Sequence, residues 1–142
     1  MLRALAILLL TTTPALAWQA RSGAICELTH EGEAAQVRVT YDPAIPEYAI
    51  EITPDRPWAP GPVFSMHFDG PRDLTISTTR HVISGGGATL TVRDSGFGNV
   101  LDGLEFNDTA IALLGDQVVA IPLDDAAPAV REFRTCTMGA SV

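Results

Sequence analysis

Apolar and polar residues alternate with a period of two through most of this chain, and this pattern narrows the choice of fold more than any other feature. The clearest run is 64–69, in which Phe64, Met66 and Phe68 alternate with polar neighbours. Successive side chains of a strand point to opposite faces, so such a run has one buried and one exposed face. Comparable runs occur at residues 24–30, 36–41, 48–53, 74–76, 90–92, 109–114 and 117–123. The chain is therefore predicted to be mostly β.

Turn residues separate these runs. A Ser-Gly-Gly-Gly stretch at 84–87 indicates one turn, and Gly-Asp at 115–116 is expected to close a final hairpin. Residues 53–62 contain four prolines, so they are predicted to form a loop rather than a central strand. Trp58 in this loop is either a plug over one end of the core or an exposed contact point, and the usual burial of tryptophan favours the plug.

After the last run the period changes to that of a helix. An aspartate at 124 or 125 can cap it, and apolar residues follow with helical spacing: Ala126, Ala129, Val130 and Phe133. Cys136 falls on the same face, which would lie against the sheet. Cys26 stands in the first predicted strand, so a Cys26–Cys136 disulfide is expected. The pair lacks the Cys-x-x-Cys spacing of a redox site, which favours a structural role.

These elements predict a mostly β protein, with a single-domain antiparallel β-sandwich or flattened barrel and one short C-terminal helix. Residues 18–142 would form this β-rich domain, because 125 residues can enclose one core.

Residues 1–17 have the three zones of a cleavable signal peptide. Arg3 makes the start of the segment positive, an apolar run follows at 4–10, and Ala15-Leu16-Ala17 has the small residues of a signal-peptidase cleavage site. The apolar run is too short to remain in a bilayer, and no later run is longer. We expect cleavage before Trp18, a periplasmic or secreted protein, and no integral membrane segment after cleavage.

The charged residues of the chain argue against nucleic acid as a partner and against a P-loop nucleotide site. The 17 acidic residues all follow residue 17, against 8 arginines there, which leaves a net charge of −9 with neutral histidines. Nucleic acid is not an expected partner, because its binding depends on basic groups that replace counterions. The chain has no lysine, and a P-loop needs one, so a nucleotide site of that type is excluded. No cofactor is expected.

Residues 94–107 are the stretch that strand patterning explains least. Asp94-Ser95-Gly96 is superficially similar to a serine-protease motif, but none of the three histidines stands in a matching context. Hard oxygens at Asp94, Asn99, Asp102 and Glu105 do not have the spacing of a calcium loop. A glycine-bent connection with Phe97, Leu101 and Leu104 packed inward is the favoured interpretation.

The histidines, His30, His67 and His81, are scattered, so no metal site is predicted. The candidate contact residues of a binding surface are Trp58, Phe97 and Asn99.

The residues from Gly98-Asn99-Val100-Leu101-Asp102-Gly103 through 118–123 to Phe133-Arg134-Thr135-Cys136 resemble small exported proteins of alphaproteobacteria that have no assigned activity. More distantly, the strand-then-helix ending resembles the invasion-associated locus B group of periplasmic β proteins. This chain has one cysteine at each end of the domain instead of that group's internal pairs. The resemblance implies an envelope protein and supplies no catalytic residue.

The sequence is compatible with two functions. The first is an exported, periplasmic, non-enzymatic binding or accessory protein, whose partner is another envelope protein or a small ligand. The alternative is a small hydrolase or metal-dependent enzyme that uses residues 94–107, which requires these side chains to converge with a histidine. The absence of a coherent catalytic set favours the first function.

Overall fold

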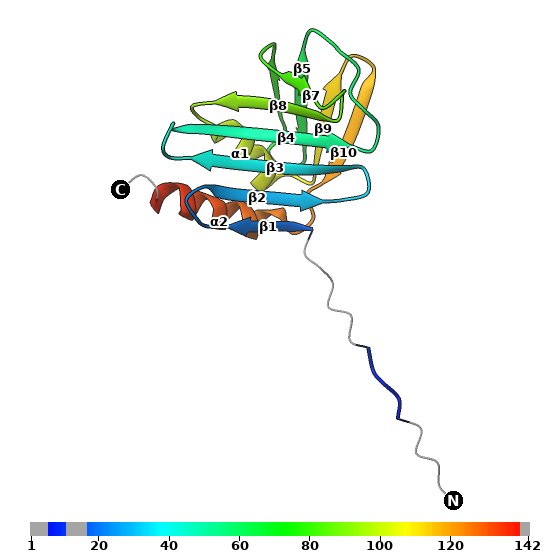
Figure 1. The fold of residues 1–142 in the computed structure, drawn as a ribbon, viewed down its shortest axis with the longest axis vertical. Helices are drawn as coiled ribbons and strands as arrows, with labels where there is room; N and C mark the ends of the chain where they lie inside the picture. The colour runs from blue at the N-terminus through cyan, green and yellow to red at the C-terminus, as the bar shows by residue number, and fades with distance from the viewer. Residues whose placement is uncertain (1–5, 11–16, 140–142) are drawn as a thin grey trace, which may run out of the picture.

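The computed structural model describes residues 6–10 and 17–139, and Figure 1 shows the fold. The described residues contain ten strands and two helices. These are β1 (Trp18–Arg21), β2 (Cys26–Glu31), β3 (Ala35–Asp42), β4 (Glu47–Pro54), β5 (Phe64–Asp69), β6 (Leu74–Thr78), β7 (Val82–Ser84), β8 (Thr89–Asp94), α1 (Gly98–Phe106), β9 (Thr109–Leu114), β10 (Gln117–Pro122) and α2 (Ala126–Gly139). None of the described helices is long and apolar enough to cross a bilayer.

The strands form two antiparallel sheets. One has six strands in the order β1-β2-β3-β4-β8-β7, and the other has four in the order β10-β9-β5-β6. Figure 1 shows the six-stranded sheet in front, with β5, β9 and β10 running across the direction of its strands. The predicted sandwich is thus confirmed: the two sheets are separate and do not close into a barrel.

The two helices complete the core where the four-stranded sheet does not reach. Helix α2 packs against β1 and β2 at one edge of the six-stranded sheet, and α1 packs against α2 (Figure 1). The face of α2 that is buried carries the residues that the helical spacing selects: Ala126, Ala129, Val130 and Phe133. The predicted C-terminal helix is therefore confirmed.

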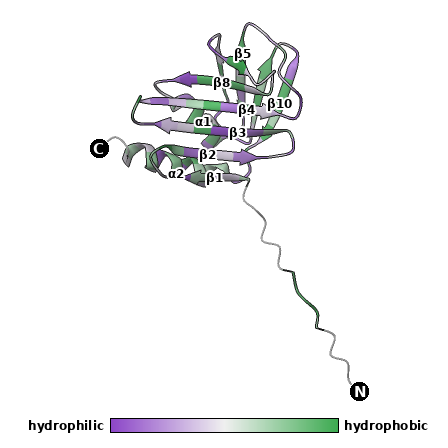
Figure 2. Ribbon diagram, in the orientation of Figure 1, coloured by the Kyte–Doolittle hydropathy of each residue, from purple (hydrophilic) through white to green (hydrophobic). Residues whose placement is uncertain are grey.

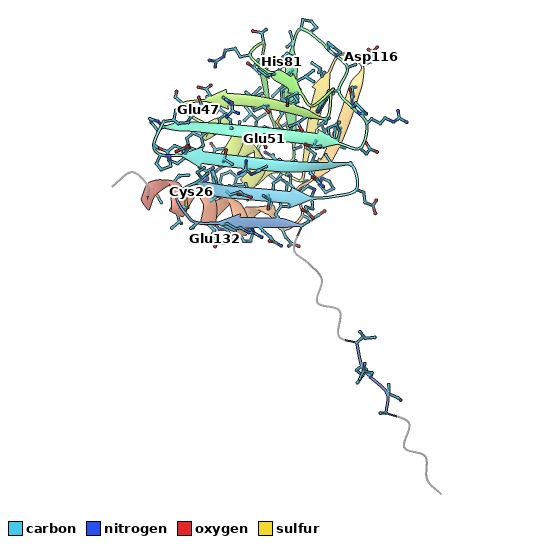
Figure 3. All side chains as sticks on the ribbon, viewed as in Figure 1. Cys26, Glu47, Glu51, His81, Asp116 and Glu132 are labelled. Carbon is cyan, nitrogen blue, oxygen red and sulfur yellow. A yellow bond between two sulfur atoms is a disulfide. The ribbon has the colours of Figure 1, made fainter. Side chains whose placement is uncertain are left out.

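Burial follows the alternation in the sequence. In β5, Phe64, Met66 and Phe68 are buried, while the residues between them reach solvent. Along the strands of the front sheet, hydrophilic and hydrophobic residues follow one another (Figure 2). The solvent face of that sheet carries ion pairs of Arg38 with Glu27 and Glu51, and Figure 3 shows Glu51 on this face. The outer face of the six-stranded sheet is therefore charged and exposed to solvent.

The predicted final hairpin is confirmed by the pairing of β9 with β10. Leu114 lies opposite Gln117, so the loop has two residues, Gly115 and Asp116. Gly115 adopts φ of 57°, a conformation that glycine accepts without the steric cost of a side chain.

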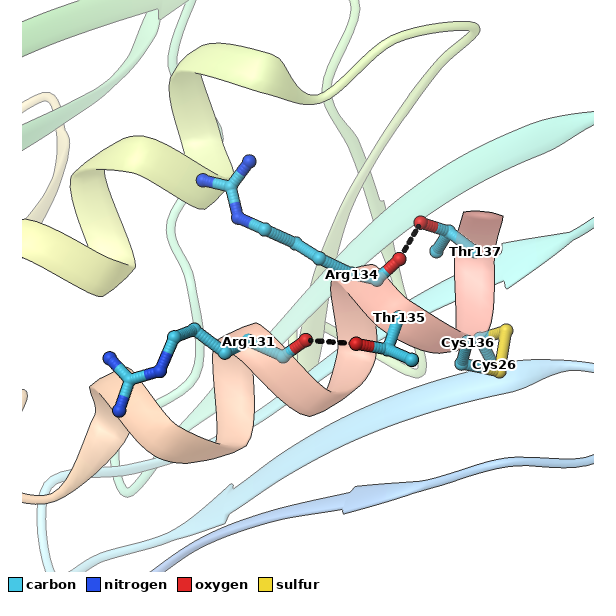
Figure 4. The surroundings of a disulfide bond; sticks show 6 residues. All are labelled: Cys26, Arg131, Arg134, Thr135, Cys136 and Thr137. Atoms are coloured by element: carbon cyan, nitrogen blue, oxygen red, sulfur yellow. Dashed lines mark hydrogen bonds between the residues drawn. A yellow bond between two sulfur atoms is a disulfide. The ribbon is translucent and has the colours of Figure 1, made fainter. Parts of the chain in front are cut away.

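The predicted Cys26–Cys136 disulfide is present, and it joins the start of β2 to the last turn of α2 (Figure 4). The two Cα atoms lie 5.9 Å apart, and the bridge spans 110 positions of sequence. Both cysteines of the chain are used, so neither is a free thiol.

Three elements differ from the sequence-based expectation. Strands β1 and β7 are short and were not predicted, and residues 98–106 form helix α1 instead of a bent connection. The inward packing of that stretch is confirmed, because Phe97, Leu101 and Leu104 are buried. The predicted signal peptide, residues 1–17, falls largely outside the described residues.

Candidate binding pocket

A pocket of about 440 Å³ opens between the two sheets, beside the start of α1. Its floor is apolar and comes from β4, β5, β6, β8 and the residue before α1: Ile50, Phe64, Met66, Ile76, Val92 and Phe97. Its rim is polar and includes Ser77, Thr78, Arg80, Asp94 and Asn99. Pockets of this size, with an apolar lining and a few polar groups, are typical of sites for small molecules.

The pocket exists because neither sheet covers the other completely at this edge. Strand β7 pairs with β8 only from Thr89 to Thr91, so β8 continues past its partner as far as Asp94. On the opposite sheet β6 is the edge strand, and its inward residue Ile76 is only half-buried. The inward side chains of β6 and of the end of β8 therefore face a gap.

An ion pair crosses the rim. The guanidinium Nη2 of Arg80 donates to Oδ2 of Asp94 at 3.2 Å, and the other Asp94 oxygen accepts the backbone N–H of Ser95 at 2.7 Å. Both side chains of the pair are exposed, so it contributes little to stability. Because the two charges cancel, the rim presents neither net positive nor net negative charge to a ligand.

Aromatic rings fix the wall that α1 provides. Phe97 stacks on Tyr48 with ring centroids 5.3 Å apart, and Tyr48 also contacts Tyr41 at 4.5 Å. Tyr48 reaches Phe133 of α2 at 6.4 Å. Gly98 and Asn99, which also line the pocket, directly follow Phe97. The position of this part of the pocket wall is therefore fixed by packing in the main core.

Of the three predicted contact residues, Phe97 and Asn99 line the pocket, and Asn99 is exposed at its mouth. Trp58 does not line it. Its side chain is 3% exposed, its indole N–H donates to the carbonyl of Ile52 at 3.0 Å, and its ring meets Phe64 edge-on. Trp58 is the plug of the core that its residue type suggests, and the interpretation as an exposed anchor is wrong.

The acidic residues of 94–107 have structural partners. Arg134 of α2 donates to Asp102 at 2.7 Å and lies 3.0 Å from Glu105, which joins α1 to α2. Asn107 accepts the backbone N–H of Arg72 at 2.9 Å and donates to the carbonyl of Gly103 at 3.1 Å. These contacts tie α1 in place and do not assemble a calcium loop.

The histidines make their hydrogen bonds outside that segment. His81 Nε2 lies 2.8 Å from the carbonyl oxygen of Gly61, and His67 contacts Thr75 and Asp73 on its own hairpin. His30 stacks on Trp18 at 4.5 Å, and burial lowers its pKa against the opposing effect of a hydrogen bond to the backbone of Ala17. Among the described residues, no hydrogen bond or ion pair joins a histidine to Asp94, Ser95 or Asp102.

The sequence does not reveal the pocket itself. Ile76 and Val92 stand in predicted strands, but the lateral offset of the sheets that leaves them uncovered is not a local property of the chain. The one sequence signal is the surplus of serine and threonine around Ile76 in residues 74–79, since an edge strand tolerates such a composition.

The fold and the pocket define a small disulfide-bridged β-sandwich with a ligand-sized opening between its sheets. No family model matches the chain, and no curated protein or solved structure is significantly similar to it. The resemblance of the C-terminal third to exported proteins stays a prediction.

Proposed function

We propose that this protein is an exported, non-enzymatic binding protein that holds a small, largely apolar molecule in the pocket between its sheets. The observation that carries the proposal is the pocket of about 440 Å³, with its apolar floor and neutral polar rim. Burial of apolar ligand surface would drive binding, and the hydroxyl group of Thr78 and the amide group of Asn99 would orient a polar end.

The charged side chains around the pocket already have partners within the protein, and this favours a binding function over a catalytic one. A hydrolase needs a nucleophile or activated water, a base and a group that stabilises developing charge, all within reach of one reacting atom. Around the pocket, the carboxylate of Asp94 pairs with Arg80, and the Ser95 hydroxyl lies 3.4 Å from that same carboxylate. A catalytic function would have to use Asp94 as its base, and this carboxylate already accepts from Arg80 and from the backbone N–H of Ser95.

Three features support export. The Cys26–Cys136 disulfide is typical of an oxidising compartment. The apolar residues Ile7, Leu8, Leu9 and Leu10 are 77–85% exposed, so they contribute nothing to the core of the domain. The first strand begins at Trp18, directly after the expected cleavage site, and its indole N–H donates to the carbonyl of Pro122 at 3.0 Å. The resemblance to small exported proteins is in keeping with this location.

Export can be tested on the full chain expressed in a Gram-negative host. We expect the protein in the periplasmic fraction, with Trp18 as its first residue by N-terminal sequencing, because the small side chain of Ala17 fits the peptidase site. The variant Ala17→Arg should keep its leader and accumulate as the precursor. Recovery of the unchanged chain from the cytoplasm, with residue 1 or 2 at its N-terminus, would contradict the proposal.

Ligand binding can be tested with N-phenyl-1-naphthylamine, a neutral apolar dye whose fluorescence rises in apolar surroundings. The wild-type protein should bind the dye at one site. Ile76→Trp places a bulky ring in the pocket, and we expect it to weaken dye binding at least tenfold, equivalent to about 1.4 kcal/mol.

The matched control is Val118→Trp, which adds the same fluorophore at an exposed position of β10 that does not line the pocket. Its affinity for the dye should equal that of the wild type. Circular dichroism spectra establish that both variants are folded. If the wild type does not bind the dye, or if the two variants bind it equally well, the pocket is not the binding site.

A further inference from the structure

A second candidate site lies on the outer face of the four-stranded sheet, away from the pocket. There, His67, Asp69 and Asp73 each offer a ligand atom, and these atoms all lie within 4.8 Å of one another. We infer that this cluster binds a divalent transition-metal ion of the Zn²⁺ type. The inference does not rest on the proposed function, because none of the three residues lines the pocket.

The hairpin of β5 and β6 places the three residues together. His67 and Asp69 are two apart in β5, so both point to the face opposite the buried Met66 and Phe68. Phe68 pairs with Leu74, which sets Asp73 at the turn beside them. Because the register is fixed by the buried face, the three ligands are brought together by the sheet and not by a loose loop.

The spacing is close to that of a metal centre. Zn²⁺ binds histidine nitrogen and carboxylate oxygen at about 2.0–2.2 Å, so two ligands in a tetrahedral site stand about 3.3–3.5 Å apart. Nε2 of His67 already lies 3.1 Å from Oδ1 of Asp73. The remaining ligand atom comes from Asp69, whose exposed side chain can rotate to close the difference.

The orientation of the imidazole also suits a metal ligand. Nδ1 of His67 lies 2.7 Å from the hydroxyl oxygen of Thr75, its cross-strand partner. When Nδ1–H donates to that hydroxyl, Nε2 carries the lone pair and faces the carboxylates. A hydrogen bond to the second ring nitrogen is the usual support of a histidine that binds a metal.

The charge around the cluster favours a cation. The ion pairs of the arginines among the described residues involve other carboxylates, those of Glu27, Glu47, Glu51, Asp94, Asp102 and Glu105. Arg72, in the turn next to Asp73, instead lies over the ring of Phe106 at 4.0 Å. Asp69 and Asp73 are thus exposed carboxylates that none of these arginine ion pairs among the described residues neutralises, and they lie beside His67.

The test is calorimetric titration of the purified, disulfide-bonded protein with Zn²⁺, together with NMR of the histidine rings. We expect one ion per chain and a shift of the His67 ring nitrogens, with those of His30 and His81 unchanged. His67→Gln, Asp69→Asn and Asp73→Asn should each weaken binding at least tenfold. Asp55→Asn, which removes the same charge from an exposed position outside the cluster, is the control and should bind as the wild type does.

Thr75 is expected to act as a positioning residue. Thr75→Val should weaken Zn²⁺ binding about tenfold, and Thr75→Ser should restore it, because the hydroxyl and not the methyl group holds the ring. Absence of binding, binding that the three ligand variants leave unchanged, or perturbation of His30 or His81 instead of His67 would each overturn the inference. Circular dichroism of every variant separates loss of a ligand from loss of the fold.

Discussion

Replacement of both cysteines, Cys26→Ala with Cys136→Ala, is expected to lower the free energy of unfolding by about 4–5 kcal/mol. The bridge closes a loop that spans 110 positions, so it removes a large share of the conformational freedom of the unfolded chain. A domain of this size has about 5–15 kcal/mol of total stability, which makes the bridge one of its largest single contributions.

Equilibrium unfolding in urea measures this effect, and the oxidised and reduced wild-type proteins provide the control. Reduction should reproduce the loss seen in the double variant, because both leave the loop open. The structure adds a local expectation: α2 packs on β1 and β2, so amide exchange should accelerate first in these three elements. A loss below about 1 kcal/mol would contradict the loop-closure argument.

The sequence predicts those parts of the fold that depend on local patterns. Strand β5 follows from the alternation of Phe64, Met66 and Phe68, and α2 follows from the spacing of Val130 and Phe133. The disulfide follows because Cys136 lies on the apolar face of a closing helix and no third cysteine competes for Cys26.

Helix α1 escapes prediction for a physical reason. Its nine residues include Gly98 and Gly103, and glycine in a helix costs about 1 kcal/mol relative to alanine. Local propensity therefore disfavours a helix, while packing of Leu101 and Leu104 into the core supplies the compensating free energy. Tertiary contacts of this kind have no signature in a short window of sequence.

The candidate sites depend on relations between distant elements, which explains why the sequence suggests them only in part. Phe97 and Asn99 are predicted contact residues and do line the pocket, whereas Arg80 joins the rim beside Asp94, to which it donates from a segment 14 positions earlier. The sequence shows His67 and Asp69 on one strand face, but Asp73 joins them only through the register of the hairpin. The sequence alone therefore does not predict either site completely, because it does not give the strand register or the offset between the two sheets.

Gly103→Ala is expected to destabilise the domain by about 2 kcal/mol, although alanine is the better helix former. Gly103 is buried against the side chain of Phe68 in β5, and a Cβ atom there would lie well inside van der Waals contact with the ring of Phe68. Phe68 is fully buried, so its ring is enclosed by the core and cannot swing out into solvent. The gain in helix propensity, about 1 kcal/mol, is therefore smaller than the cost of displacing the ring or the helix.

The control for this prediction is Gly98→Ala in the same helix, where a Cβ atom meets nothing within 4 Å. Its free energy of unfolding in urea should equal or slightly exceed that of the wild type. A second variant, Gly103→Ala with Phe68→Leu, should lose less stability than the two single changes together, because the smaller side chain makes room for the new methyl group. Equal effects of the alanine at positions 98 and 103 would mean that propensity, and not the close approach of α1 to β5, decides the stability of this helix. Because α1 also forms one wall of the pocket, Gly103→Ala should weaken binding of the apolar dye as well.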